Sequence, residues 1–374
     1  LYFAGLDPVK CINAVSRLAT YPWFLSNAPP FDAEKMRPSE FRKEVADVLS
    51  LYIKVPSESD GIKTAIAECV GMQRNLGLKS IVIPAPLIDE TGLNTYIKWI
   101  DSAIENDCVG DRDLVTLAIC SGSFARSEVF IDCIIDNISS REAIRGVYVV
   151  VISDTASKRI EDQAVAEGLL RLSYELGRVV GLKVIINYAD DFGLFCRAFG
   201  ATAFGTCYDL KGRRAYYPDY EETDGWGYRY PYFYSNSLFC DFLSNVHLNQ
   251  FRNAELLWFF DEDKTDSSRA LLTALKEGKS ANEVPQWRQE HNRIEAAKEH
   301  RMELLTIANN SIDACDGNEQ VRLGVQKIRQ AHLRAEYCKE RILPRVTRNL
   351  SHIEVWKNAC EGFSRRVVET RPTV

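Results

Sequence analysis

The feature that most constrains the fold of this chain is a repeated alternation of apolar, β-branched runs with helical patterns. Two of the helical patterns end at a glycine that leads directly into the next apolar run, in Gly77-Leu-Lys-Ser and Gly181-Leu-Lys-Val. A glycine just past a helix, followed by a nearly continuous apolar strand, is typical of αβ connections in a parallel sheet. The predicted strands are Leu1–Leu6, Ser80–Pro84, Leu114–Cys120, Val147–Ile152, Val184–Tyr188 and Ala201–Cys207, with Tyr232–Tyr234 as a further candidate, and the helical patterns include Gly61–Leu76 and Glu161–Val180.

Six or seven such units predict an α/β fold, a TIM-like (β/α) barrel over residues 1–260. After Phe260 the strand-type runs end, and a charged segment leads into helical patterns. We therefore expect residues 261–374 to form an all-helical appendage. Its helices should be interrupted near Pro285, Gly317 and Pro344.

Composition limits the class of protein. The chain has 374 residues, 46% of them hydrophobic, and no stretch reaches about eighteen uninterrupted apolar residues, so we expect a large core and no membrane contact. The eleven cysteines include no CxxC spacing and several lie in apolar runs, which favours reduced thiols in a cytoplasmic protein. No signal peptide is expected, and the opening Leu1-Tyr-Phe is either a cloning remnant or native.

The net charge of −6 hides an asymmetry along the chain. From Lys264 onward 20 Lys and Arg accompany 15 Asp and Glu, whereas the preceding residues hold 26 against 37. An acidic barrel with a basic tail predicts two surfaces with different partners.

Polar side chains follow the predicted strands, where an α/β barrel builds its site. Asp190 and Asp209 are the candidates for catalysis by acid–base or nucleophilic chemistry, and Asp191 beside Asp190 offers a like-charge pair with one raised pKa. The alternative for each strand-end Asp or Ser is to cap the helix that follows. The candidates for binding a base or another ligand are Asp7, Asp89, Ser121, Ser123, Asp154 and Asn187.

Other catalytic arrangements find less support in the sequence. Cys207 follows a predicted strand, but all five histidines lie at or after His247, which disfavours a Cys–His pair. No CxC, CxxC or HxxxH spacing and no standard glycine-rich phosphate loop occurs, so we expect neither a metal nor a cofactor. No lysine is placed at a strand end to form a Schiff base, which disfavours a lyase or an aldolase.

Basic and aromatic segments are candidate contacts to a phosphate or a partner. Residues 216–234 interleave Tyr and Trp with Arg, a pattern typical of base stacking and equally of lids and interfaces. In the tail, basic residues recur every seven positions and would form one stripe on a continuous helix, with a solvated helix face as the alternative; Pro344 should break that helix. The residues concerned are Lys211, Arg213 and Arg214 after the sixth strand, and Lys327, Arg334, Arg341 and Arg348 in the tail.

Two short segments resemble the tRNA-guanine transglycosylase superfamily, including its DNA-modifying and defence-associated branches. Cys120-Ser-Gly-Ser-Phe124 is similar to that family's Asp-Ser-Gly-(Gly/Ala)-Phe strand end. Gly200-Ala-Thr-Ala-Phe204 through Gly212-Arg-Arg-Ala215 is similar to its Gly-Ala-Asp-x-Phe-Asp…Arg-x-Gly segment. The resemblance implies a (β/α)8 barrel and the exchange of guanine for a 7-deazaguanine base through a covalent ribosyl–aspartate intermediate.

The chain also departs from the family pattern. Gly205 occupies the position of the family's nucleophilic Asp, Cys120 replaces the Asp before Ser-Gly, and His247 alone remains where the family has a four-ligand zinc site. Asp209, four residues past Gly205, is the expected substitute nucleophile. The resemblance thus implies a divergent, zinc-less barrel that binds a purine or 7-deazapurine base, free or within a nucleic acid, in nucleobase modification or prokaryotic antiviral defence, with the exchange chemistry altered or lost.

The alternative is a non-catalytic scaffold. In that case the aromatic loop and the basic helical tail would bind a partner protein or a nucleic acid.

Overall fold

A computed structural model describes residues 57–75, 78–88, 92–126, 128–155, 157, 159–208, 213–216, 230–290, 294–342, 344–347 and 350–369. The chain forms two compact units that interleave in sequence. The sheet unit takes residues 1–158, 172–189 and 200–224, and the helical unit takes residues 159–171, 190–199 and 225–374. The two units are defined by which residues pack together, and each combines separate stretches of the chain. This division does not test the predicted boundary between a domain at 1–260 and one at 261–374, which stays a prediction.

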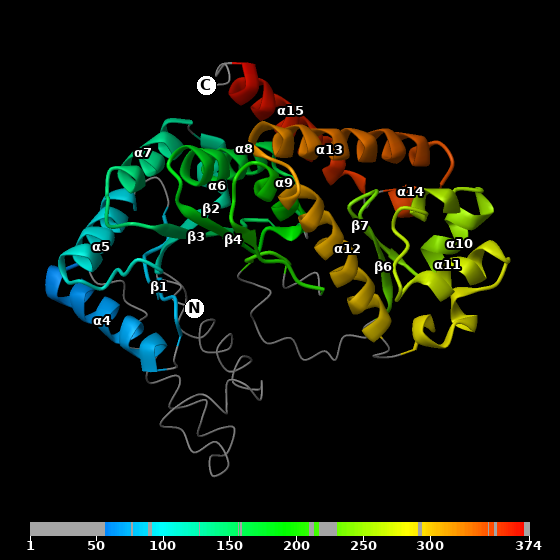
Figure 1. Cartoon of the computed structure of the whole chain (residues 1–374), viewed down its shortest axis with the longest axis horizontal. Helices are drawn as coiled ribbons and strands as arrows, with labels where there is room; N and C mark the ends of the chain where they lie inside the picture. Colours follow the sequence, from blue (N-terminus) through cyan, green and yellow to red (C-terminus); the bar gives the residue numbers. More distant parts are fainter. Residues whose placement is uncertain are drawn as a thin grey trace, which may run out of the picture. The chain divides into compact units, whose positions relative to one another are not determined.

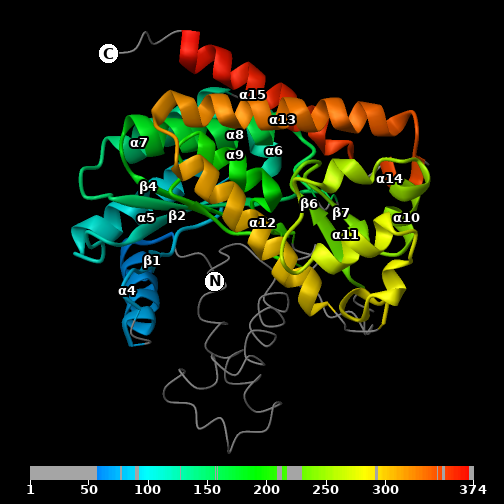
Figure 2. The ribbon, with the colours of Figure 1, turned by 45° about the vertical axis from the view of Figure 1, so that its right-hand side comes forward.

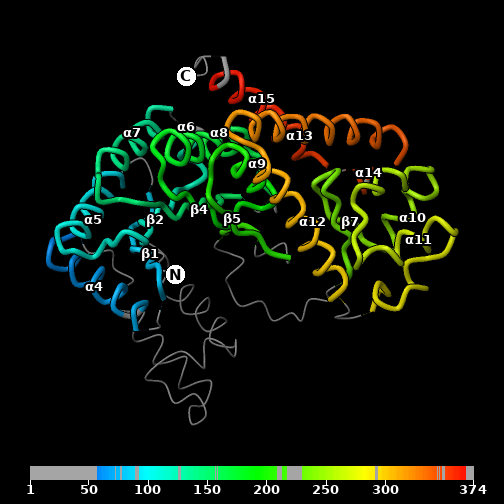
Figure 3. The backbone as a smooth tube through the Cα atoms, in the orientation of Figure 1, coloured from blue at the N-terminus to red at the C-terminus, as the bar shows by residue number. Residues whose placement is uncertain are grey.

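Five parallel strands in the order β1-β2-β3-β4-β5 form the sheet of the sheet unit. The register places Val150 opposite both Ala118 and Asn187, in the two neighbouring strands. Figure 3 shows the short last strand next to the fourth. The strands are β1 (Val82–Ile83), β2 (Leu114–Cys120), β3 (Gly146–Ile152), β4 (Lys183–Asn187) and β5 (Ala203–Phe204).

Helices cover one face of this sheet because of its strand order. Each strand is added beyond the one before it, and right-handed crossovers then leave the two connecting helices within this unit, α5 (Leu93–Glu105) and α7 (Glu128–Ser139), on the same face. Figures 1 and 2 show α5 and α7 flanking the strands. Alternate strand residues such as Val115, Leu117 and Ile119 are completely buried. The helices and the π-helix of this unit are α4 (Ser59–Asn75), α5 (Leu93–Glu105), α6 (Ser121–Arg126), α7 (Glu128–Ser139) and η1 (Ser173–Val179).

The predicted α/β class with a parallel sheet is confirmed, whereas the described strands do not close into a barrel. The predicted strand Leu1–Leu6 lies outside the described residues. The candidate Tyr232–Tyr234 is a strand but not part of the parallel sheet: β6 (Tyr232–Ser235) pairs antiparallel with β7 (Cys240–Leu243). Only four residues join these two strands, too few for the crossover that a parallel pair requires.

The helical unit packs this hairpin among helices around an aromatic core. Trp356 has its ring centroid 5.4 Å from that of Phe192 and 5.8 Å from that of Phe195. His352 binds the carbonyl oxygen of Phe239 through Nε2 at 2.9 Å, which ties the last helix to the hairpin turn. The α-helices are α8 (Gln163–Leu172), α9 (Gly193–Ala198), α10 (Val246–Asn253), α11 (Arg269–Lys276), α12 (Glu295–Asp313), α13 (Gly317–Lys339), α14 (Pro344–Thr347) and α15 (His352–Glu369), and the 3-10 turns are η2 (Asp190–Phe192), η5 (Leu257–Phe260), η6 (Ala281–Glu283) and η7 (Pro285–Trp287).

The predicted helical C-terminal region and its interruptions are confirmed. Pro285, Gly317 and Pro344 are the first residues of η7, α13 and α14. Proline suits a first helical position because its missing N–H would have no partner there. Within the described residues, no helix combines the length and apolarity needed to cross a membrane.

Candidate ligand site at the carboxyl edge of the sheet

The ends of β2 and β3 are joined by a reciprocal pair of residues, Ser121 and Asp154. The Ser121 hydroxyl donates to Asp154 Oδ2 at 3.0 Å, and the Asp154 backbone N–H donates back to Ser121 Oγ at 2.9 Å. The Gly122 N–H donates to the same Oδ2 at 2.7 Å. Asp154 is exposed, and no described residue hydrogen-bonds its Oδ1. The carboxylate is therefore oriented by one of its oxygens and offers the other as an acceptor.

Gly122 is required by this arrangement. A Cβ at position 122 would lie 2.8 Å from Asp154 Oδ2, inside the contact distance of real Cβ atoms. The Ser-Gly pair after β2 thus supplies a hydroxyl, an N–H and the room for one carboxylate. Asp154 follows β3 but caps the start of α6, the helix after the neighbouring strand β2, and not the helix that follows its own strand. Ligand binding by Asp154 stays a prediction.

Asn187 ends β4 and contacts residues on both neighbouring strands. Its Nδ2 donates to the hydroxyl oxygen of Tyr148 on β3. On the other side its amide lies over Gly205, where a built Cβ would overlap Asn187 Oδ1 and lie 3.0 Å from Cγ. Burial raises the pKa of Tyr148, and the neighbouring Tyr188 raises it further. The hydrogen bond from Asn187 offsets part of this rise.

An apolar floor lies beside these polar groups. Val150, Ile152 and Ala215 form a buried cluster, against which the half-buried Tyr148 and Tyr188 pack together with Leu87. Ala215 pairs with the end of β3, since its carbonyl accepts a hydrogen bond of 2.8 Å from the Ser153 N–H. Tyr188 has φ of 56°, a left-handed conformation that non-glycine residues adopt at a cost, often at functional sites.

The remaining predicted residues of the sheet unit differ in their placement. Ser123 is described and buried, one turn into α6. Arg213 is 1% exposed, and its guanidinium donates to the carbonyl oxygens of Cys207 at 2.7 Å and Tyr208 at 2.9 Å, so it holds the loop after β5. Arg214 lies over the ring of Tyr216, 4.6 Å from its centroid. Asp7, Asp89, Asp209 and Lys211 lie outside the described residues.

Asp190 belongs to the helical unit and lies in a buried ion cluster. Arg159 contacts Asp190 at 3.2 Å, Asp191 at 3.3 Å and Asp241 at 3.1 Å. Arg301 pairs with Asp191 and, at 3.3 Å, with Asp241. The side chains of Asp190 and Asp191 are 1% and 0% exposed.

This cluster has the character of a structural core. Two arginines lie among three carboxylates, and Arg301 also covers the ring of Tyr234 at 4.4 Å. Removing one member would leave a buried charge uncompensated. Among the residues that the structure describes, no group of His, Cys, Asp or Glu is arranged to hold a metal ion. A catalytic role for Asp190 stays a prediction.

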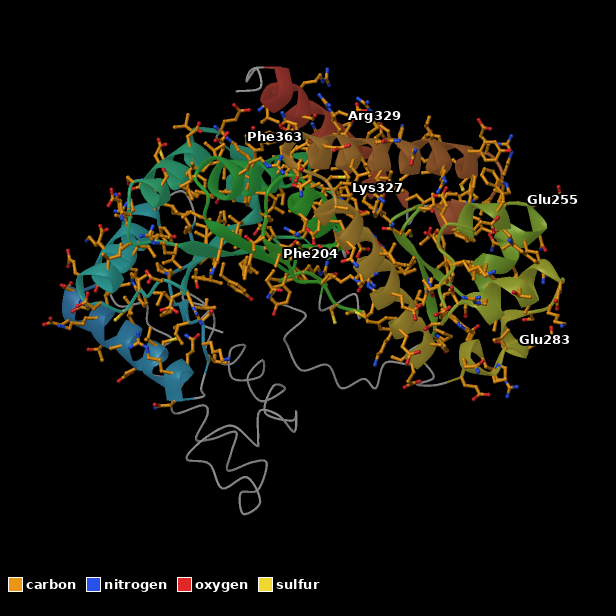
Figure 4. The ribbon with its side chains drawn as sticks, viewed as in Figure 1. Phe204, Glu255, Glu283, Lys327, Arg329 and Phe363 are labelled. Carbon is orange, nitrogen blue, oxygen red and sulfur yellow. The ribbon has the colours of Figure 1, made fainter. Side chains whose placement is uncertain are left out.

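The described basic residues of the predicted tail stripe do not share one continuous helix, and Arg348 lies outside the described residues. Lys327 and Arg334 lie in α13, which ends at Lys339 before Arg341; Figure 4 shows Lys327 on this helix together with Arg329. Arg334 pairs with Glu262 at 3.1 Å. Arg341 lies 3.6 Å above the ring centroid of Tyr337 and pairs with Glu340 at 2.9 Å. Partner or nucleic-acid binding by this region stays a prediction.

Sequence reasoning missed Tyr148 and Tyr188 as parts of the site. Tyr148 lies within the predicted strand Val147–Ile152, where its polar tip in an otherwise aliphatic run is the available signal. Tyr188 is the last residue of the predicted strand Val184–Tyr188.

In comparisons with known proteins, no family model, no curated protein and no solved structure matches the chain.

Proposed function

We propose that the carboxyl edge of the sheet binds a purine or 7-deazapurine base, free or within a nucleic acid, and that Asp154 accepts hydrogen bonds from its N–H groups. The observation that carries this proposal is the orientation of Asp154 by Ser121 and Gly122. A carboxylate with one oxygen tied down and the other open suits a planar ligand edge with neighbouring N–H donors.

The position of the site supports ligand binding as well. Ligands of parallel α/β proteins bind at the carboxyl ends of the strands, in barrels and in open sheets alike. The end of β2 also carries the Cys120-Ser-Gly-Ser-Phe124 segment that resembles the transglycosylase superfamily. We include in the proposal that the five strands belong to a (β/α) barrel of that kind. A place in nucleobase modification or antiviral defence is the biological context that the resemblance suggests.

The proposal excludes the family's base exchange at position 205. That chemistry needs a carboxylate nucleophile, and here the amide of Asn187 fills the space that a side chain on Gly205 would need. Asn187 therefore occupies the space in which the family's nucleophile would lie. Binding without exchange is the function that these residues support best.

Titration calorimetry on the full chain with guanine, 7-deazaguanine and adenine tests the proposal. We expect the two guanine-type bases to bind and adenine, which lacks the N1–H and 2-amino donors, to bind at least about tenfold more weakly. Asp154→Asn keeps the acceptor for Ser121 and Gly122 and should weaken guanine binding by about tenfold or more.

Asp111→Asn is the matched control, because Asp111 is an exposed aspartate in the turn that precedes β2. It should leave binding unchanged. Mass spectrometry of the purified protein adds an independent search for a retained base. If no purine binds, or if Asp154→Asn and Asp111→Asn behave alike, the proposal fails.

A further inference from the structure

We propose that Asn187 is a second ligand-contacting group, whose amide is turned by Tyr148 and given room by Gly205. The inference rests on the proposed function and deepens it. It assigns to the ligand a second hydrogen-bond donor, separate from the edge that Asp154 contacts; in a 7-deazaguanine-type base that donor is the N9–H, so the inference concerns the free base. Tyr148 acts through Asn187 and is a positioning residue.

Tyr148 decides which end of the amide is available. The Asn187 Nδ2 donates to the Tyr148 hydroxyl oxygen, so the nitrogen is engaged within the protein. The other polar atom of the amide, Oδ1, lies next to Gly205. A carbonyl oxygen there can accept a hydrogen bond but cannot donate one. The site therefore selects a donor on the ligand at this point.

Gly205 makes that orientation possible. Its backbone is held against β4 by two hydrogen bonds, from Gly205 N–H to the Ile186 carbonyl at 2.8 Å and from Ala189 N–H to the Gly205 carbonyl at 3.1 Å. The peptide cannot move away to admit a side chain without breaking this pairing. Any larger residue at position 205 would displace the Asn187 amide from its place.

The spacing of the two acceptors sets the size of the ligand. Asn187 lies opposite Val150, and Asp154 follows Val150 by four residues along the chain. At about 3.3 Å per residue the two acceptors are separated by at most about 13 Å along the strand direction. A bicyclic base with donors on two edges fits within this limit. The half-buried Tyr148 and Tyr188, which pack on the buried cluster of Val150, Ile152 and Ala215, offer such a ring an apolar surface.

The test uses two probes that differ by one donor, 7-deazaguanine and its 9-methyl derivative, titrated into the full-length protein. The five-membered ring of 7-deazaguanine has a single N–H, at position 9, which methylation removes. We expect the unsubstituted base to bind roughly tenfold more tightly, the size of one well-made hydrogen bond. In Asn187→Ala this preference should fall to about one, because the acceptor is gone.

Three variants separate positioning from general damage. Tyr148→Phe keeps the ring, removes the oxygen that orients the amide, and should reduce the preference between the probes. Asn187→Asp keeps an acceptor at this position and should retain the preference for the unsubstituted probe. Asp154→Asn should weaken both probes alike and leave their ratio unchanged. Cooperative thermal unfolding of each variant shows that it is folded, and the ratio is a readout that a merely structural role would not move.

The outcomes distinguish this inference from the proposed function. If 7-deazaguanine binds in an Asp154-dependent manner while Asn187→Ala leaves the probe ratio unchanged, Asn187 is not a contact and the proposed function survives. If neither probe binds the unmodified protein, both proposals fall.

Discussion

The side-chain amide of Asn187 lies over the Cα of Gly205, in the space that any larger residue at position 205 would need for its Cβ. The Asn187 side chain at the end of β4 thus fills the space beside the glycine that directly follows β5.

Gly205→Ala should lower the free energy of unfolding by about 1–3 kcal/mol, because the added Cβ overlaps Asn187 Oδ1. Urea denaturation measures the change. Gly71→Ala is the control: nothing lies within 4 Å of a Cβ at this helical position, so it should be neutral or stabilising by about 0.5–1 kcal/mol. Equal losses in both variants would show that the contact with Asn187 is unimportant.

Arg301→Met should destabilise the protein by about 3–5 kcal/mol, since it leaves Asp191 and Asp241 with less compensation inside the core. The control is Arg329→Met, which breaks a pair with Glu361 in which the arginine is 59% exposed, and which should cost less than about 1 kcal/mol. Chemical denaturation of the two variants in parallel checks the difference. A small loss for Arg301→Met would mean that the cluster adds little stability.

Asp263 should make the protein less stable as the pH rises. Burial raises the pKa of this carboxyl to about 6, partly offset by hydrogen bonds from Ser235 at 2.5 Å and Ser237 at 3.0 Å. The folded state therefore holds a proton that the unfolded state, with a pKa of about 3.9, has released. The contribution of this proton to the free energy of unfolding is fully present below about pH 4 and is lost as the pH rises through about 6. The free energy of unfolding changes by about 3 kcal/mol over this range.

The difference in unfolding free energy between the parent protein and Asp263→Asn, measured from pH 4 to 7.5, isolates this contribution. The asparagine does not titrate, so the difference should fall with increasing pH. A difference that is constant across the range would contradict the raised pKa.

His300 should act in the opposite direction. Burial lowers its pKa to about 4, since the ring stacks on Phe233 with a centroid distance of 4.4 Å. The hydrogen bond of 2.7 Å to the Tyr234 carbonyl acts in the opposite direction and offsets part of this shift. The neutral ring stabilises the fold fully above the unfolded pKa of about 6.5, and this stability is lost as the pH falls toward 4.

His300→Gln removes the titration, so the stability difference from the parent should shrink by about 3 kcal/mol between pH 7 and 4. NMR titration of the His300 ring gives a direct check. A midpoint near 6.5 would refute the prediction.

Local sequence patterns predicted the sheet strands well where the run is long and aliphatic. The range Leu114–Cys120 is β2 itself, and Val147–Ile152 differs from β3 by one residue. Prediction was poorer where strands are short: the range Ala201–Cys207 contains only the two-residue β5. The aromatic run at Tyr232 has strand propensity too, but propensity does not specify a partner, and the short turn after it enforces an antiparallel one.

The sequence by itself determined the class of the fold and the position of polar groups at the strand ends, because side-chain period, β-branching and glycine placement act within a few residues. Only the tertiary structure decided which of those groups meet. It joined Ser121 to Asp154, turned Asn187 toward Tyr148 and placed Asp190, with φ of 49°, in an ion cluster instead. These partners lie tens of residues apart, and their pairing depends on strand register and on the space left beside a glycine, which no local pattern encodes.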